Sequence, residues 1–423
     1  MKRREFIQAT AGVASGLLLL KPNAAFGYQA NSAVRLGLLG CGARGTHVAT
    51  SFSQNTVAQV AALADLFPNQ LEAGRAHFNA VNARLGRQPV DAKLLFRGQH
   101  AFEQLAASAD VDLIQISTPP FFHVEHLEAA VAAGKHVYCE KPVGIDVKQA
   151  RQALEIAKRV RPAQSVDVGF QCRSAPPIAA IAEKTKAGAL GKIASISAYY
   201  YAPASKEKVF PGASADEYRL RNWLWDRALS GDILVEQNIH IIDLCNWMLE
   251  ARPLKATASG GRNILTHGGD CWDNYQVDFS YPGDVHVSFA STQFGDYGLF
   301  EAGLRLFGSE GAATVPYAGP VEIVGKQKWA WQDSAGTSAG AGKFAANGNF
   351  EDNLAFADRD KERTFIDSIV NGPVHNQIAA GVETALSCMM GRMAGLRRRE
   401  VTWEELEAHG ETYKLGMDLA RLG

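Results

Sequence analysis

Three residues near the middle of the chain have the types and the spacing that proton transfer needs. Glu236, His240 and Asp243 follow one another at intervals of four and three residues. If residues 231–250 form a helix, these intervals place two carboxylates and an imidazole on one helix face. A histidine changes its protonation near neutral pH, so it acts as a general acid or base with little tuning. The same three residues could instead be a satisfied polar helix face.

A lysine in the first half of the chain is the second candidate for chemistry. Lys141 lies in the tripeptide Glu140-Lys141-Pro142, directly after residues 136–139, which read as a short buried strand. The ordinary pKa of a lysine is too high for a base at neutral pH, but burial beside a positive charge lowers it. Lys141 could therefore accept a proton or polarise a reacting oxygen.

A glycine-rich turn near the start of the chain indicates a dinucleotide site. Residues 40–45 read Gly-Cys-Gly-Ala-Arg-Gly between a strand-like stretch, residues 34–39, and a helical one, residues 46–54. The first glycine permits a tight turn, the second lets a pyrophosphate approach the backbone, and the third allows the helix to pack on the strand. The helix N-terminus offers N–H groups to the phosphates. We expect these residues to hold the cofactor: Gly40, Gly42, Ala43, Arg44 and Gly45.

An acidic residue at the end of the next strand-like stretch favours NAD over NADP. Asp65 ends an apolar stretch that begins at residue 57, and it follows the last glycine of the motif by about 20 residues. An acid at this spacing accepts a hydrogen bond from the ribose 2′-hydroxyl, and its charge would repel a 2′-phosphate. The sequence therefore predicts NAD as the cofactor.

Strands and helices alternate up to about residue 172, which predicts a doubly wound parallel sheet. Ligands of such sheets bind beyond the carboxyl ends of the strands, so the residues that follow the strands should meet in one cleft. These residues are Gly40, Asp65, Thr118 and Lys141. We expect a Rossmann domain over residues 31–172.

After residue 172 a succession of strands replaces the alternation. Residues 231–250 read as one helix, and strand-like stretches then follow without helices between them. Consecutive strands indicate a largely antiparallel sheet, so we expect a second domain of the α+β class over residues 173–423. The stretches are residues 254–259, 274–281, 284–292 and 301–307, with a hairpin turn at 281–284.

The composition excludes two classes of protein. The 423 residues include 43 Lys and Arg and 44 Asp and Glu, which is not the basic excess that nucleic-acid binding requires. The six cysteines show no CxxC spacing, so we expect neither a disulfide scaffold nor a structural zinc site, and we expect no bound metal. The hydrophobic share of 47% is enough for a sizeable core.

The first 30 residues are predicted to be an export signal. Arg3 and Arg4 precede the uncharged residues 6–20, and small residues follow at 24–27. The uncharged stretch is shorter than the ~20 residues that span a bilayer. The segment resembles a twin-arginine signal, which predicts the twin-arginine translocase as a partner and a periplasmic or otherwise exported protein. The alternative is an uncleaved membrane anchor.

Together these motifs resemble the Gfo/Idh/MocA family of dinucleotide-dependent sugar and cyclitol oxidoreductases. The resemblance covers nearly everything after the export signal. It implies a Rossmann domain followed by an open, mostly antiparallel sheet domain that binds the substrate, and we expect a homo-oligomer. The family usually has an aspartate four residues before the histidine, where this chain has Glu236. The motifs that carry the resemblance are the glycine turn, Thr118-Pro119 with His123, Glu140-Lys141-Pro142, and Glu236-x-x-x-His240-x-x-Asp243.

The resemblance adds roles to the residues. His240 would be the acid or base, Glu236 would orient it or a sugar hydroxyl, and Lys141 would polarise the reacting oxygen. Beside the glycine motif and Asp65, the cofactor would contact Thr118, Pro119, His123, Glu140 and Lys141. The substrate would contact Lys141, Arg173, Trp223, Glu236, His240 and Asp243.

Three functions are compatible with these residues. The first is an oxidoreductase that transfers a hydride between a tightly bound NAD and a secondary alcohol of a sugar, glycoside or cyclitol. The second is a redox-neutral, NAD-dependent glycoside hydrolase, which would oxidise a ring hydroxyl, eliminate the aglycone, add water and reduce again. The third is a non-catalytic sugar-binding protein on a Rossmann core. An exported enzyme would meet no soluble NAD pool, so its cofactor would have to be recycled in place.

Overall fold

The computed structural model describes residues 33–266, 268–295, 298–332 and 343–422. The predicted export signal lies outside this range. From Val34 onward the chain is one compact unit. Among the described residues, no helix combines the length and the apolar character that crossing a membrane requires.

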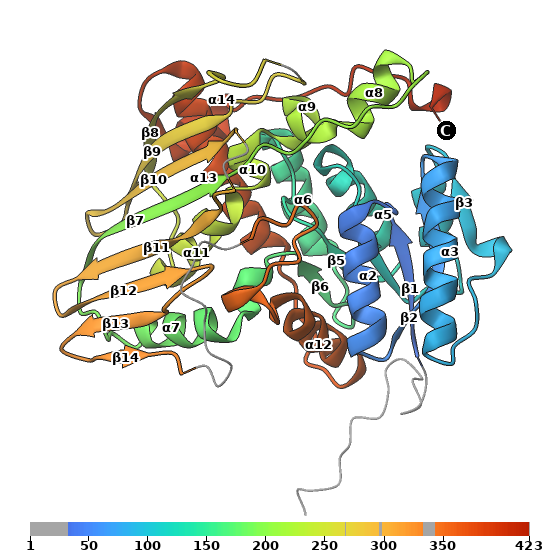
Figure 1. The fold of residues 1–423 in the computed structure, drawn as a ribbon, viewed down its shortest axis with the longest axis horizontal. Coiled ribbons are helices and arrows are strands. Elements are labelled where there is room, and N and C mark those ends of the chain that lie inside the picture. Colours follow the sequence, from blue (N-terminus) through green and yellow to red (C-terminus); the bar gives the residue numbers. More distant parts are fainter. Residues whose placement is uncertain (1–32, 267, 296–297, 333–342, 423) are drawn as a thin grey trace, which may run out of the picture. The chain divides into compact units, whose positions relative to one another are not determined.

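The first sheet of the described chain is fully parallel, and its strand order is β3-β2-β1-β4-β5-β6. This is the order of a dinucleotide-binding Rossmann fold, and it confirms the predicted doubly wound sheet. The central strands β1, β4, β5 and β6 are short and almost wholly buried, because helices lie on the sheet (Figure 1), whereas the edge strand β3 is partly exposed. The strands of this sheet are β1 (Val34–Leu39), β2 (Ala58–Asp65), β3 (Leu95–Arg97), β4 (Leu113–Ile116), β5 (His136–Cys139) and β6 (Val166–Val168).

Helices connect these strands. The helix after the glycine turn begins at Ala43, inside the motif, rather than at residue 46, because Thr46 N–H already donates to the carbonyl of Gly42. A further helix, α6, is capped by the preceding Asp146, whose carboxylate accepts from the N–H of Gln149 in the first turn. The helices are α2 (Ala43–Asn55), α3 (Pro68–Arg84), α4 (Ala101–Ala107), α5 (His123–Ala132) and α6 (Val147–Arg159).

The second sheet is antiparallel apart from one pair of strands. Over the described residues its order is β14-β13-β12-β11-β7-β10-β9-β8-β15, and only β7 and β10 run parallel. The predicted hairpin is confirmed, since Tyr281 pairs with Val285 across the turn. The shorter strands after residue 310 were not predicted. The strands are β7 (Ile193–Ala202), β8 (Lys255–Gly261), β9 (Asn274–Tyr281), β10 (Val285–Gln293), β11 (Glu301–Gly308), β12 (Gly311–Pro316), β13 (Glu322–Gly325), β14 (Trp329–Ala330) and β15 (Val401–Thr402).

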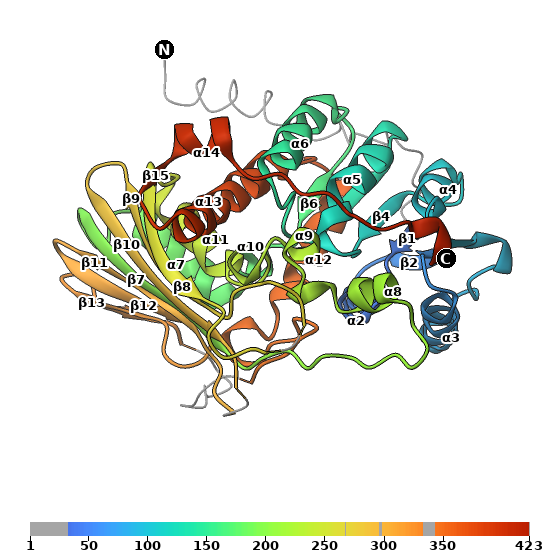
Figure 2. The same ribbon diagram turned by 90° about the horizontal axis from the view of Figure 1, so that it is seen from above.

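One face of the second sheet packs on helices, which lie between it and the first sheet (Figures 1 and 2). Buried and exposed residues alternate along β9 and β10, as expected for a sheet with one covered face. The long helix α13 is apolar almost all round and is buried over most of its length. The helices of this part are α7 (Pro176–Lys186), α8 (Ala215–Arg221), α9 (Arg227–Ser230), α10 (Ile233–Glu236), α11 (Ile239–Leu249), α13 (Ile378–Arg397) and α14 (Trp403–His409).

One late helix returns to the first sheet. The helix α12 (Ala357–Val370) packs against α2, and Asn376 forms a parallel bridge with Val166 of β6. Residues from late in the chain therefore contact the helix that follows the glycine turn. Where a boundary between two domains falls stays a prediction.

Candidate functional site

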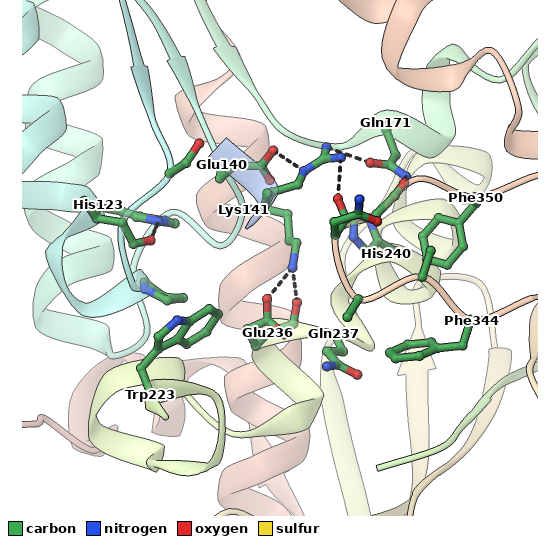
Figure 3. A pocket seen from close by; sticks show the side chains of 18 of the residues that line it. His123, Glu140, Lys141, Gln171, Trp223, Glu236, Gln237, His240, Phe344 and Phe350 are labelled. Carbon is green, nitrogen blue, oxygen red and sulfur yellow. Dashed lines mark hydrogen bonds and ion pairs between the residues drawn. The ribbon is translucent and has the colours of Figure 1, made fainter. Parts of the chain in front are cut away.

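A pocket lies where the carboxyl ends of β4 and β5 face α10, α11 and residues 344–350 (Figure 3). Residues from both halves of the chain line it, so motifs that are about a hundred residues apart share one space. Of the sequence-predicted residues, it brings together Arg44, Thr118, His123, Glu140, Lys141, Trp223, Glu236 and His240. Residues that the sequence did not single out also line it: Ser117, Pro120, Gln171, Tyr200, Gln237, Phe344, Ala345, Ala346, Asn347, Gly348 and Phe350.

Lys141 and Glu236 form an ion pair at the centre of the pocket (Figure 3). The Nζ of Lys141 donates to Oε1 of Glu236 and to the carbonyl oxygen of the same residue, both at 2.6 Å. The two side chains are only 12% and 11% exposed, so solvent screens the pair weakly. An ammonium group has three donors, and these contacts use two of them. Lys141 can therefore donate one further hydrogen bond to a ligand oxygen.

The helix predicted over residues 231–250 is broken between Glu236 and Ile239. The short helix α10 ends at Glu236, and α11 begins at Ile239. The carbonyl oxygen of Glu236, which would accept from residue 240 in a continuous helix, accepts instead from Lys141. The prediction of one continuous helix is therefore wrong, although Glu236 and His240 both line the pocket.

His240 is a buried histidine that lines the pocket and has a lowered pKa. Burial is the main reason that its pKa lies well below the ordinary value of 6.5, and the positive charges of Lys141 and Arg44 lower it further. Its side chain is buried, and its Nδ1 has no hydrogen-bond partner among the described residues. A neutral imidazole in a lined pocket can serve as a base for a hydroxyl group.

Arg44 of the glycine motif lines the pocket and donates hydrogen bonds to four other segments of the chain. Its Nε donates to Glu140 at 2.8 Å, and its two Nη groups donate to Asp358 of α12 at 2.7 and 2.9 Å. Burial alone would raise the pKa of Asp358, but the Arg44 guanidinium brings it well below its usual range. Arg44 also donates to Gln171 and to the carbonyl of Asn347. All five N–H donors of the Arg44 guanidinium are thus used within the protein.

His123 joins the two loops that follow β4 and β5. Its Nδ1 lies 2.8 Å from the carbonyl oxygen of Pro142, and its Nε2 lies 2.7 Å from that of Thr118. His126 of the same helix is buried rather than on the helix surface, with Nδ1 3.0 Å from the hydroxyl of Thr118. It packs against Phe122 because α5 turns this face toward the loop after β4. Both histidines thus position Thr118.

The glycine turn fits a dinucleotide pyrophosphate. Gly40 has a φ of +95°, and a Cβ there would meet the carbonyl oxygen of Ser117 at 2.6 Å. A Cβ on Gly45 would meet the carbonyl oxygen of Gly40 at 2.1 Å, which explains the close packing of α2 on β1. A Cβ on Gly42, by contrast, would meet no described atom within 4 Å. The open side of Gly42 is where a phosphate can approach the backbone.

The neighbouring groups complete this fit. No side chain caps the N-terminus of α2 and its first turn holds no acidic residue, so the N–H groups near Ala43 can face an anion. Asp65 ends β2, and its carboxylate accepts from the N–H groups of Cys41 at 2.7 Å and Phe67 at 2.9 Å. This orients the acid that would bind the ribose. Gly40, Gly42, Ala43, Asp65 and Pro119 do not line the pocket around Lys141.

Arg173 and Asp243, which were expected to contact substrate, are paired with each other outside the pocket lining. Arg173 donates to both carboxylate oxygens of Asp243 at 2.7 and 2.6 Å. Asp243 also accepts from the hydroxyl of Thr384 in α13, and the guanidinium lies over the rings of Phe170 and Trp247. These contacts connect α11 with its surroundings rather than with a ligand.

Aromatic rings and paired charges give the pocket its character. Trp223 lies on one side of Lys141 in Figure 3, and Phe344 and Phe350 lie on the other. Among the described lining residues, the cations are Arg44 and Lys141, and each is paired with a carboxylate. The described lining residues therefore offer a ligand no unpaired charge, only neutral donors, acceptors and ring faces.

The described residues contain no group of three or more His, Cys, Asp or Glu that could hold a metal ion. All six cysteines are buried and none is in a disulfide. His267, which with Asp270 and Asp273 could be drawn as a metal site, lies outside the described residues.

Comparison with known proteins connects this geometry to a family. The model of an oxidoreductase family with an NAD-binding Rossmann fold matches residues 34–168, and the model of the GFO/IDH/MocA C-terminal domain matches residues 178–314. Inositol 2-dehydrogenase of Rhizobium meliloti (strain 1021) is 26% identical over 69% of this chain and 78% of its own length.

Two further relatives differ in their described activities. A glycosyl hydrolase family 109 protein of Solibacter usitatus (strain Ellin6076) is 32% identical over 37% of this chain and 36% of its own length. The structure of apo scyllo-inositol dehydrogenase from Lactobacillus casei superposes with a TM-score of 0.67 at 18% identity, covering 89% of this chain and 100% of that one. At that identity it shows the fold alone. The two family models together match more than half of the sequence, and the chain belongs to the Gfo/Idh/MocA family of oxidoreductases, whose Rossmann domain binds NAD.

Proposed function

We propose that this protein is an NAD-dependent oxidoreductase that acts on a secondary alcohol of a neutral sugar, glycoside or cyclitol. The observation that carries the proposal is the pocket in which Lys141, at the end of β5, meets Glu236 and His240 from the second half of the chain. Bound NAD supplies the hydride acceptor or donor of such a reaction. The protein supplies the groups that move the proton and hold the substrate.

His240 is the proposed base. Its lowered pKa keeps the imidazole neutral at pH 7, so it can accept the proton of the reacting hydroxyl and return it in the reverse direction. Lys141 is paired with Glu236 and is therefore better suited to donate a hydrogen bond to the reacting oxygen, where negative charge develops. Glu236 holds Lys141 in place, and its second oxygen is available to a neighbouring hydroxyl.

The balance of charges supports a neutral substrate. The Lys141 and Arg44 side chains already neutralise Glu236 and Glu140, so a phosphate or carboxylate on the substrate would find no unpaired cation among the described lining residues. The ring faces of Trp223 and Phe344 suit the apolar faces of a sugar or cyclitol ring. Gln171 and Gln237 offer neutral amides to its hydroxyls.

A panel of substrates tests this proposal. Purified protein is mixed with neutral pyranoses, glycosides and cyclitols, and with their phosphorylated or uronic acid counterparts, and the absorbance of NADH at 340 nm is followed. We expect NADH to form with members of the neutral set only. Formation with the anionic set alone, or with neither set in a protein that holds NAD, would contradict the proposal.

A redox-neutral glycoside hydrolase is the second candidate, and the match to glycosyl hydrolase family 109 proteins favours it. Lys141, Glu236 and His240 could serve either reaction. An aryl-glycoside panel without added cofactor separates the two. Repeated release of the aryl group without net NADH supports the hydrolase, whereas NADH formed by one sugar and reoxidised by a second supports the oxidoreductase.

We also propose that the protein is exported through the twin-arginine pathway. The support is the sequence of the first 30 residues, in which Arg3 and Arg4 precede an uncharged stretch. Replacing both arginines by lysine in a fusion of residues 1–33 to a reporter should block export. Unchanged export of that variant would contradict the assignment.

A further inference from the structure

The C-terminal segment ends over the cofactor side of the first sheet. After α14, residues 411–422 run along α6 and α5 toward the loops that follow β2 and β4 (Figure 2). Two contacts fix the start of this segment. The N–H of Tyr413 donates to Oδ2 of Asp146 at 2.8 Å, and Glu411 lies 3.2 Å from Nε of the buried Arg392.

An apolar cluster joins the segment to those loops. Phe67, which follows β2, and Phe122, which follows β4, are buried together with Leu220 of α8. Side chains of the C-terminal segment pack against the same cluster, namely Leu415, Met417, Leu419 and Leu422. The carbonyl of Leu415 also accepts from Arg219 of α8 at 2.8 Å. We call residues 411–422 together with α8 the strap.

Arg221, the last residue of α8, fastens the strap beside Asp65. Its guanidinium carbon lies 3.7 Å from the ring centroid of Phe67 and 4.8 Å from that of Phe210. Its Nη2 donates to Oδ1 of Asn69 at 3.0 Å, and its side chain is only 9% exposed. Phe67 is two residues beyond Asp65, the acid that fits the adenosine ribose. Arg221 therefore lies against the loop that carries the ribose-binding acid.

We propose that the strap retains the dinucleotide by covering the adenosine half of its site. In a doubly wound sheet the ribose of that half lies at the acid after the second strand, and the ligand lies beyond the carboxyl ends of the strands. The strap packs on the loops at two of these ends. Exchange of the dinucleotide requires the strap to detach. Detachment exposes the apolar side chains of the strap to water, and this unfavourable step slows the exchange. The strap thus determines how long the cofactor stays bound, whatever the substrate.

Dissociation of bound NAD tests the strap directly. Purified protein loaded with NAD is mixed with an excess of fluorescent etheno-NAD, and the exchange rate is measured for three variants. One variant ends at Lys414, one is Arg221→Ala, and one is Arg84→Ala, a matched control at an exposed arginine at the end of α3 and outside the strap. Far-UV circular dichroism and thermal melting establish that each variant is folded.

We expect the truncation and Arg221→Ala each to speed exchange at least roughly tenfold, the change that follows from losing about one good contact. Arg84→Ala should exchange at the wild-type rate. A folded truncation and a folded Arg221→Ala that both exchange NAD as slowly as the wild type would overturn the inference. Wild-type exchange as fast as that of the truncation would overturn it too. A wild-type chain that binds no NAD at all would instead contradict the cofactor assignment itself.

Discussion

Lys141 is the residue on which the proposed chemistry depends most directly. It is held at 2.6 Å from Glu236, so its position does not depend on a ligand. We expect Lys141→Ala to lower kcat by about 10²–10³, the usual effect of removing one preorganised donor from an active site. Bound NAD should remain, because the glycine turn and Asp65 are unaffected. Steady-state kinetics and denaturing release of NAD measure both effects, with the exposed Lys148→Ala as the control.

Retained activity in Lys141→Ala would remove this residue from the mechanism. Loss of both activity and NAD would show that Lys141 supports the cofactor site rather than the reaction. Lys148→Ala should match the wild type in both measurements.

The protonation of His240 sets the pH dependence at the residue scale. A base must be neutral to act, and burial holds the pKa of His240 well below 6.5. Substrate oxidation should therefore lose no activity through this group as the pH falls from 8 to about 6.5, and should decline only below that pH. The pH profile of kcat/KM measures this. A decline centred at or above pH 6.5 that disappears in His240→Asn would contradict the lowered pKa.

The residue scale also shows what the sequence could and could not indicate. Lys141, His123 and His240 stand in recognisable motifs, and the structure brings all three to one pocket. Phe344 and Asn347 belong to residues 334–349, which are rich in Gly, Ala and Ser and show no periodic pattern. Arg221 belongs to no motif. Such residues reach the site only through tertiary packing.

At the scale of elements, α12 holds Arg44, a lining residue of the pocket, in place. Asp358 in its first turn accepts two hydrogen bonds from Arg44, and both side chains are largely buried. Removing one partner of a buried pair leaves a charge without compensation, so Asp358→Ala should lower the free energy of unfolding by about 3 kcal/mol. Urea unfolding measures this loss, and Asp367→Ala on the exposed face of the same helix is the control. Equal stability of the two variants would contradict this role.

Elements with a strong local pattern were predictable from the sequence, and elements without one were not. The strand before the glycine turn and the hairpin at residues 281–284 follow from apolar periodicity and turn residues. The strands β13, β14 and β15 contain four, two and two residues, too few to show a period. At the break before Ile239 the carbonyl of Glu236 accepts from Lys141, which is 95 residues away in the sequence, so a local pattern gives no sign of this contact.

At the scale of the whole molecule, buried histidines link stability to pH. Burial lowers the pKa of His126 to about 3, so between pH 6.5 and about 3 the unfolded chain binds a proton that the folded chain does not. Above pH 6.5 this histidine does not lower the free energy of unfolding. Below pH 6.5 it should lower the free energy of unfolding by about 1.4 kcal/mol for each pH unit. Urea unfolding at several pH values measures the slope.

His126→Asn removes the titrating group. It should reduce the slope of the free energy of unfolding against pH by about 1.4 kcal/mol per pH unit, the contribution of one proton. His286→Asn, a substitution at an exposed histidine of β10, should leave the slope unchanged. An equal slope in wild type and His126→Asn would show that His126 is protonated in the folded protein.

Both halves of the chain contribute residues to the pocket. The first half contributes Lys141 and the residues that fit NAD, and the second contributes Glu236, His240 and the aromatic wall. This arrangement is the structural basis of the proposed reaction, because neither half alone contains both the cofactor site and the base.

The most direct test of this account is a single mixing experiment with the holoenzyme. Protein saturated with NAD and freed of excess cofactor is mixed with the neutral sugar or cyclitol that reacts best, and absorbance at 340 nm is recorded for one turnover. The account predicts that wild-type protein forms close to one NADH per bound NAD, and that Lys141→Ala and His240→Asn form it far more slowly with NAD still bound. NADH formation at the wild-type rate in both variants would contradict it.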